Sequence, residues 1–142
     1  MFNITIRLLI FIVCYIDIVI MSYYGLGLIS LISLLIMTII SRMLIDYYNK
    51  KLARALFIDA CEKKAVNDFE NAERTMLKSI SLSMDPKFKA MCFHNLGNWN
   101  LKSNKVASQN YYEKSIDFDP DYYKPYVGIG WLFMTLENLT EA

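Results

Sequence analysis

The chain has 142 residues, enough for one modest domain, and 55% of them are hydrophobic, above the roughly 45–50% of ordinary soluble domains. Its net charge of +1 argues against a nucleic-acid-binding protein, which usually carries a basic face. The sequence has no phosphate-binding, metalloprotease or serine-hydrolase motif and no Cys-x-x-Cys, and its lone His94 has no ligand-spaced partner. We therefore expect no enzyme, no cofactor and no metal site.

The charged residues divide the chain into two parts near residue 42. Between Arg7 and Arg42 the only charged residue is Asp17, whereas residues 43–142 contain 13 basic and 13 acidic residues. The first part, residues 1–42, is predicted to lie in the membrane. Residues 43–51 are a basic juxtamembrane linker, and residues 52–142 are a charge-balanced soluble domain.

The apolar part is long enough for two membrane spans. A hydrocarbon core of about 30 Å needs roughly 20 helical residues, and residues 4–22 and 26–41 supply one full and one slightly short span. Gly25 and Gly27 permit a tight reversal between them. Basic residues follow the second span and predict that both ends of this hairpin, and the domain after it, face the cytoplasm (Arg42, Lys50, Lys51 and Arg54). The alternatives are a cleaved signal peptide before one anchor, and a single helix over residues 4–41.

Asp17 is the one residue of the apolar part that needs a polar partner. An acid at membrane depth costs a few kcal/mol, so such groups usually face protein. Folding the hairpin near Gly25 brings Ser30 and Ser33 to a similar depth, and their hydroxyls can satisfy a protonated carboxyl. An acid close enough to the headgroups to stay hydrated is the other structural explanation. A polar contact with a partner helix and a proton-linked site are the functional alternatives.

After residue 50 the pattern changes to amphipathic helices of about a dozen residues, separated by breaks at residues 83–86 and 119–121. The segment from Ser108 through Tyr112 and Ser115 to Asp119-Pro120 resembles the second helix of a tetratricopeptide repeat. That pattern has a small residue, an aromatic four later, a small residue three later and a final Asp-Pro. Residues 72–82 have the same spacing.

The first helices of the units also resemble this family. Phe93…Leu96-Gly97 and the segment 126–130 follow its aromatic, aliphatic, glycine pattern, with a weaker version at 56–60. Aligning Ala60, Gly97 and Gly130 gives spacings of 37 and 33, close to the family's 34. The resemblance implies an all-α fold: the transmembrane hairpin followed by an α-solenoid of about two and a half helix pairs, in units 53–86, 88–120 and 122–142.

The residue types fit helices that pack closely in such a stack. The small residues expected to let helices approach closely are Ala60, Ala72, Gly97, Ser108, Ser115 and Gly130. The large residues expected to fill the gaps between helices are Phe69, Met76, Phe93 and Tyr112. The last helix, from Tyr123 to about Leu136, has no second helix after it. A truncated record, a covering partner and an end cap are the three explanations for its apolar outer face.

In this family the first helix of each unit lines a concave groove that holds a peptide or helix. By phase, the groove residues here are Arg54, Phe57, Cys61, Lys64, Met91, His94, Asn95, Asn98, Lys102, Lys124, Val127 and Trp131. One branch of the family grips the C-terminal carboxylate of chaperones. Asn95 and Lys124 match two of its five positions, and Phe57, Cys61 and Gly128 replace the others, so this specificity is not expected.

The sequence therefore predicts a membrane-anchored scaffold or adaptor that binds a protein partner through the groove or the exposed last helix. The bilayer is the second expected partner, and a homo-oligomer is compatible with both. One alternative is a small subunit of a membrane transport or secretion complex, in which the hairpin carries assembly. The other is a secreted or lumenal repeat module behind a signal anchor.

Overall fold

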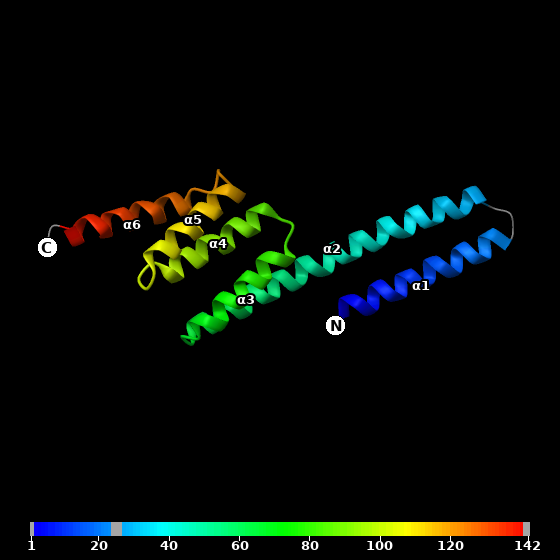
Figure 1. Ribbon diagram of the computed structural model, residues 1–142, viewed down its shortest axis with the longest axis horizontal. Coiled ribbons are helices and arrows are strands. Elements are labelled where there is room, and N and C mark those ends of the chain that lie inside the picture. Colours follow the sequence, from blue (N-terminus) through cyan, green and yellow to red (C-terminus); the bar gives the residue numbers. More distant parts are fainter. Residues whose placement is uncertain (1, 24–26, 141–142) are drawn as a thin grey trace. The chain divides into compact units, whose positions relative to one another are not determined.

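The computed structural model describes residues 2–23 and 27–140, and these residues form six helices without a strand (Figure 1). The helices are α1 (Phe2–Tyr23), α2 (Gly27–Ala65), α3 (Phe69–Leu82), α4 (Pro86–Asn100), α5 (Lys105–Phe118) and α6 (Lys124–Thr140). The all-α expectation is confirmed for this part of the chain.

The chain divides into two compact units, residues 1–48 and 49–142, close to the boundary that charge predicts. In the first unit, α1 is described to Tyr23 and α2 from Gly27, and the alternative of a single helix over residues 4–41 is not tested by the described residues. The reversal at Gly25 lies outside the described residues. Apolar side chains such as Phe11 and Leu35 are exposed, at 80% and 62%.

One helical segment among the described residues, Leu31–Ala65 in α2, is long and apolar enough to cross a membrane. The described apolar stretch of α1 is shorter, Phe11–Ile20. One candidate span is thus found where the sequence predicts two, and the hairpin stays a prediction. The residues assigned to a linker, 43–51, are helical and belong to the 39-residue α2, because no glycine or proline interrupts the chain between residues 28 and 65.

In the second unit, short polar residues set the helix ends. The α2–α3 turn has Asn67 at φ 64°, with Asp68 N–H donating to the Lys63 carbonyl and Asn67 N–H to that of Lys64. This pair of hydrogen bonds defines a Schellman motif with its left-handed residue at Asn67. The carboxylate of Asp85 caps α4, where it accepts from the amides of residues 87 and 88. Pro86 is the first residue of α4 and not the last of the preceding unit.

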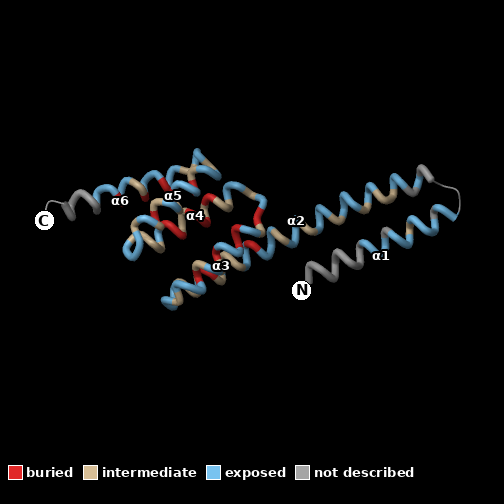
Figure 2. The backbone as a smooth tube through the Cα atoms, in the orientation of Figure 1, coloured by how far each residue is buried: buried red, intermediate tan, exposed pale blue. Residues whose placement is uncertain are grey.

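The core of the second unit lies between α2, α3 and α4 and consists of Ala60, Met76, Ile80, Cys92, Phe93 and Leu96. Figure 2 shows buried residues concentrated in the helices of this unit. Two equivalent hydrogen bonds join its helices: Ser79 Oγ donates to the Ala53 carbonyl at 2.6 Å, and Ser115 Oγ to that of Ala90 at 2.7 Å. The donors are 36 residues apart and the acceptors 37, so the α2–α3 and α4–α5 pairs are built alike.

Most of the residues expected at close helix contacts are buried, and two are not. Ala60, Ala72, Gly97, Ser108, Ser115, Met76, Phe93 and Tyr112 are buried. Phe69 is 48% exposed, so its assignment to the core is wrong. Gly130 is exposed, with no atom within 4 Å of an added Cβ, because no helix packs on that side of α6 in the described part of the chain.

Candidate protein-binding groove

A groove of about 270 Å³ lies between α4 and α6. It is lined by His94 and Asn98 of α4, by Tyr123 just before α6, and by Lys124, Val127, Gly128 and Trp131 of α6. Helix α5 holds the two walls together, since it packs on both α4 and α6. Five of the groove residues expected from the sequence therefore share one surface: His94, Asn98, Lys124, Val127 and Trp131.

The buried Tyr112 of α5 lies under this groove. Its hydroxyl donates to Asn98 Oδ1 at 2.7 Å, and its ring centroid is 5.8 Å from that of His94. A Cβ on Gly97 or on Gly128 would be 2.5 Å from a Tyr112 ring atom. The absence of a side chain at these two glycines is thus what lets α4 and α6 approach the ring.

The hydrogen bond from Tyr112 also determines the tautomer of His94. Because Asn98 Oδ1 accepts from the hydroxyl, Asn98 Nδ2 is the group that donates to His94 Nε2, at 3.0 Å. The neutral imidazole then carries its proton on Nδ1, which is buried without a hydrogen-bond partner among the described residues. Burial, and secondly the charge of Lys124, lower the pKa of His94. The ring is therefore an uncharged part of the groove floor at neutral pH.

The α6 wall presents apolar and basic groups together. Val127 and Trp131, one helical turn apart, are 52% and 58% exposed. Lys124 is also exposed, with its Nζ 6.0 Å from the centroid of the Tyr122 ring. Among the side chains that the structure describes, no acidic one lines the groove. This surface is suited to a ligand with an apolar side chain and a negative charge.

Other residues expected to line the groove lie elsewhere in the second unit. Phe57 and Cys61 of α2 are half-buried and pack against the core, and the Phe57 ring meets that of Phe88 edge to face. Asn95 is half-buried, and its amide donates to the Met91 carbonyl. The remaining four do not line this groove: Arg54, Lys64, Met91 and Lys102.

Two lining residues were missed from the sequence. Tyr123 is four residues before Val127 and eight before Trp131, so helical spacing was the signal that could have found it. In the sequence, Gly128 is distinguished only by its departure from the chaperone-binding pattern. No sequence signal distinguishes its packing role from that of Gly130, two residues later.

The described residues include no group of three or more His, Cys, Asp or Glu side chains placed to hold a metal ion. Burial, and secondly the charge of Cys61, raise the pKa of Cys92 to about 12, so this thiol is protonated at neutral pH and is a poor nucleophile.

The polar contact predicted within the apolar part stays a prediction. Asp17 and Ser33 are both partly buried. The side chain of Ser30 lies outside the described residues.

Comparisons of the chain with models of protein families, with curated proteins and with solved structures return no match.

Proposed function

We propose that this protein is a membrane-anchored interaction module that binds a segment of a partner protein in the groove between α4 and α6. The observation that carries the proposal is the groove itself, where apolar and basic side chains of α6 face a polar wall from α4. Binding is the mechanism, and the anchor confines the module to a surface, which raises the effective concentration of partners there.

The tetratricopeptide resemblance supports a binding role for the second unit. The equivalent bonds from Ser79 and Ser115 join the two helices within each of two successive pairs in the same way, as expected of repeated units. The resemblance further implies a solenoid, here of two helix pairs and a single last helix. In that family, the first helices of the units, equivalent to α4 and α6, line the ligand groove.

The apolar unit supports a membrane anchor. The part of α2 before Arg42 is the first proposed span. Helix α1 has 22 residues, the length of a second span, and a hairpin of the two is the finer form of the proposal. Basic residues after the α2 span favour a cytoplasmic location for the second unit.

The partner segment is expected to be extended or helical, with at least one large apolar side chain and one carboxylate. Trp131 and Val127 provide the apolar contact, and Lys124 provides the opposite charge. Because the groove is open, affinity depends on a few well-packed contacts and not on area, as in other protein interfaces.

The test uses the full chain in its native membrane with a photo-cross-linking amino acid in place of Val127. We expect a discrete cross-linked partner that is lost when Trp131→Glu or Lys124→Glu is added. Asn98 is left unchanged, because it accepts the hydrogen bond of Tyr112.

The matched control places the same cross-linker at Val106 of α5, which is 73% exposed and does not line the groove. A partner captured from position 106 as well as from 127, or one that persists after both charge changes, would show that the groove is not the binding site.

A further inference from the structure

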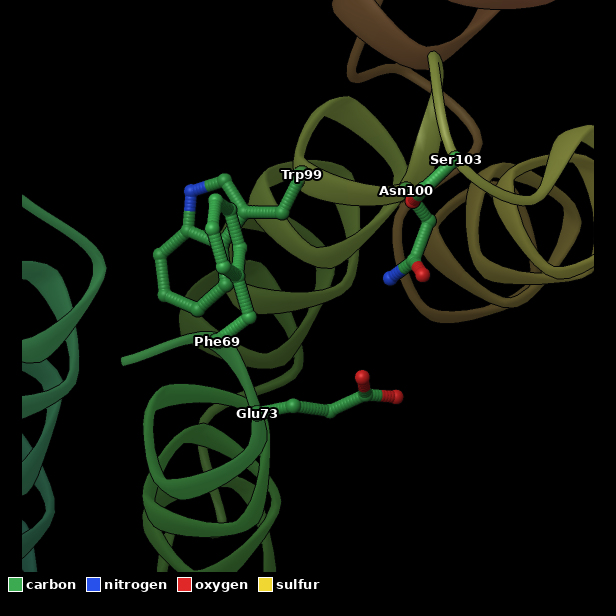
Figure 3. A pocket seen from close by; sticks show the side chains of 5 residues that line it. All are labelled: Phe69, Glu73, Trp99, Asn100 and Ser103. Atoms are coloured by element: carbon green, nitrogen blue, oxygen red, sulfur yellow. The ribbon is translucent and has the colours of Figure 1, made fainter. Parts of the chain in front are cut away.

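A second pocket, of about 320 Å³, lies between the start of α3 and the end of α4. It is lined by Phe69 and Glu73 of α3, by Trp99 and Asn100 of α4, and by Ser103 of the following turn (Figure 3). None of these residues lines the groove between α4 and α6. The inference drawn from this pocket therefore does not depend on the proposed function.

Aromatic rings form one side of the pocket. Phe69 and Trp99 both line it, and Figure 3 shows their rings on the same side. Such rings attract cations to their faces. The Phe69 ring already holds one, since Lys64 Nζ lies 3.5 Å from its centroid. Lys64 does not line the pocket, so the space between α3 and α4 is left for another group.

The carboxylate of Glu73 supplies negative charge on the other side. Glu73 is half-buried, and Oε1 accepts a hydrogen bond from the Tyr111 hydroxyl, which fixes the side chain. In the described part of the chain it makes no ion pair; the two pairs found are Lys63–Asp59 and Arg74–Glu70. The carboxylate therefore keeps acceptor capacity for a bound cation, which would form a charge-assisted hydrogen bond with it.

Two more acceptors point to the type of cation. Asn100 Nδ2 donates to the Leu96 carbonyl, which leaves Oδ1 as the free end of the amide. In Figure 3 the amide of Asn100 and the carboxylate of Glu73 point toward the same space, with Ser103 beside Asn100. Three oxygen acceptors suit a primary ammonium, which has three N–H donors, better than a quaternary ammonium, which has none.

We propose that this pocket binds the side chain of a lysine from a bound polypeptide. The ammonium donates to Glu73 and Asn100, and the methylene stem lies along Trp99 and Phe69. The contact combines a charge-assisted hydrogen bond with an aromatic surface for the stem, as amphipathic lysine side chains require.

The experiment records the indole N–H resonances of the ¹⁵N-labelled full chain in detergent micelles. The chain has two tryptophans, so Trp99 reports on the pocket and Trp131 is an internal control, with Trp131→Phe used for assignment. The probes are Nα-acetyl-lysine methylamide, which keeps its side-chain ammonium, its norleucine and trimethyl-lysine analogues, and ethanolamine. We expect only the lysine probe to move the Trp99 resonance saturably while that of Trp131 stays in place.

Two variants test the carboxylate. Glu73→Gln keeps an acceptor for Tyr111 but removes the charge, and we expect it to weaken binding of the lysine probe about tenfold. Glu70→Gln, an exposed carboxylate one turn earlier on α3, is the matched control and should leave binding unchanged. A Trp131 resonance at the same chemical shift as in the parent chain shows that each variant is folded. In the unaltered chain, 0.5 M salt should also weaken binding, which tests the charge without a substitution.

The proposal is overturned if the norleucine probe shifts Trp99 as the lysine probe does, or if Glu73→Gln binds as tightly as the parent chain. Equal binding of the trimethyl-lysine probe would exclude a role for the N–H donors. Equal binding of ethanolamine would show a site for small amines and not for a lysine side chain.

Discussion

At the residue scale, the contact of Tyr112 with two glycines organises the groove. The ring is fully buried and is fixed at its hydroxyl by Asn98. It cannot move away from a methyl group placed on Gly97 or Gly128, where the nearest ring atoms would be 2.5 Å from the new carbon. Gly130 has no such neighbour, although the sequence pattern gives it the role of a close-contact residue.

The two glycines of α6 therefore respond to alanine in opposite directions. Gly128→Ala should lower the free energy of unfolding by about 1–3 kcal/mol, because it overpacks the contact with Tyr112. Gly130→Ala should raise it by about 0.5–1 kcal/mol, because alanine favours the helix and meets no atom there. Denaturant unfolding of the two variants beside the parent chain measures both. A loss of stability in Gly130→Ala would mean that this face is covered.

At the element scale, the helix ends follow from short polar residues and proline. The continuity of α2 follows from the absence of glycine and proline between residues 28 and 65. Asp85 and Pro86 mark the start of α4 in the sequence. The sequence does not predict the turn at Asn67, because a lone asparagine between two helical segments is a weak signal. Only the observed φ of 64° and the paired hydrogen bonds identify the motif.

This turn should be sensitive to the residue at position 67. Asn67→Gly should leave stability unchanged or raise it slightly, since glycine adopts positive φ without steric cost. Asn67→Ala should lower the free energy of unfolding by about 1 kcal/mol, because the left-handed conformation crowds the β-carbon. Thermal unfolding of the pair measures the difference. Equal stability of the two variants would show that the turn does not hold this conformation.

At the scale of the whole molecule, the two units are suited to different environments. Every core residue of the second unit lies at or after Ala53. The first unit leaves its apolar side chains exposed, which in a soluble domain would be an aggregation hazard. A lipid environment removes that hazard.

Removing the first unit should therefore abolish membrane attachment and leave the second unit folded. A chain of residues 49–142 should appear in the soluble fraction after alkaline carbonate extraction, whereas the full chain should stay with the membrane pellet. The shorter chain should still unfold cooperatively, because it retains the core and both serine hydrogen bonds. A fragment that stays in the pellet would show that the first unit is not the anchor.

The sequence by itself determined the helical class, the division into an apolar and a charge-balanced part, and most of the small residues at helix contacts. These features depend on local periodicity and composition, which the chain carries without its tertiary structure. The tertiary structure decided which glycine meets Tyr112 and that Phe57 and Cys61 pack on the core. It also placed Glu73 and Trp99 on the lining of one pocket. Each of these depends on the rotation and approach of helices far apart in the chain, and a shift of one or two residues along a helix changes the face on which a side chain lies.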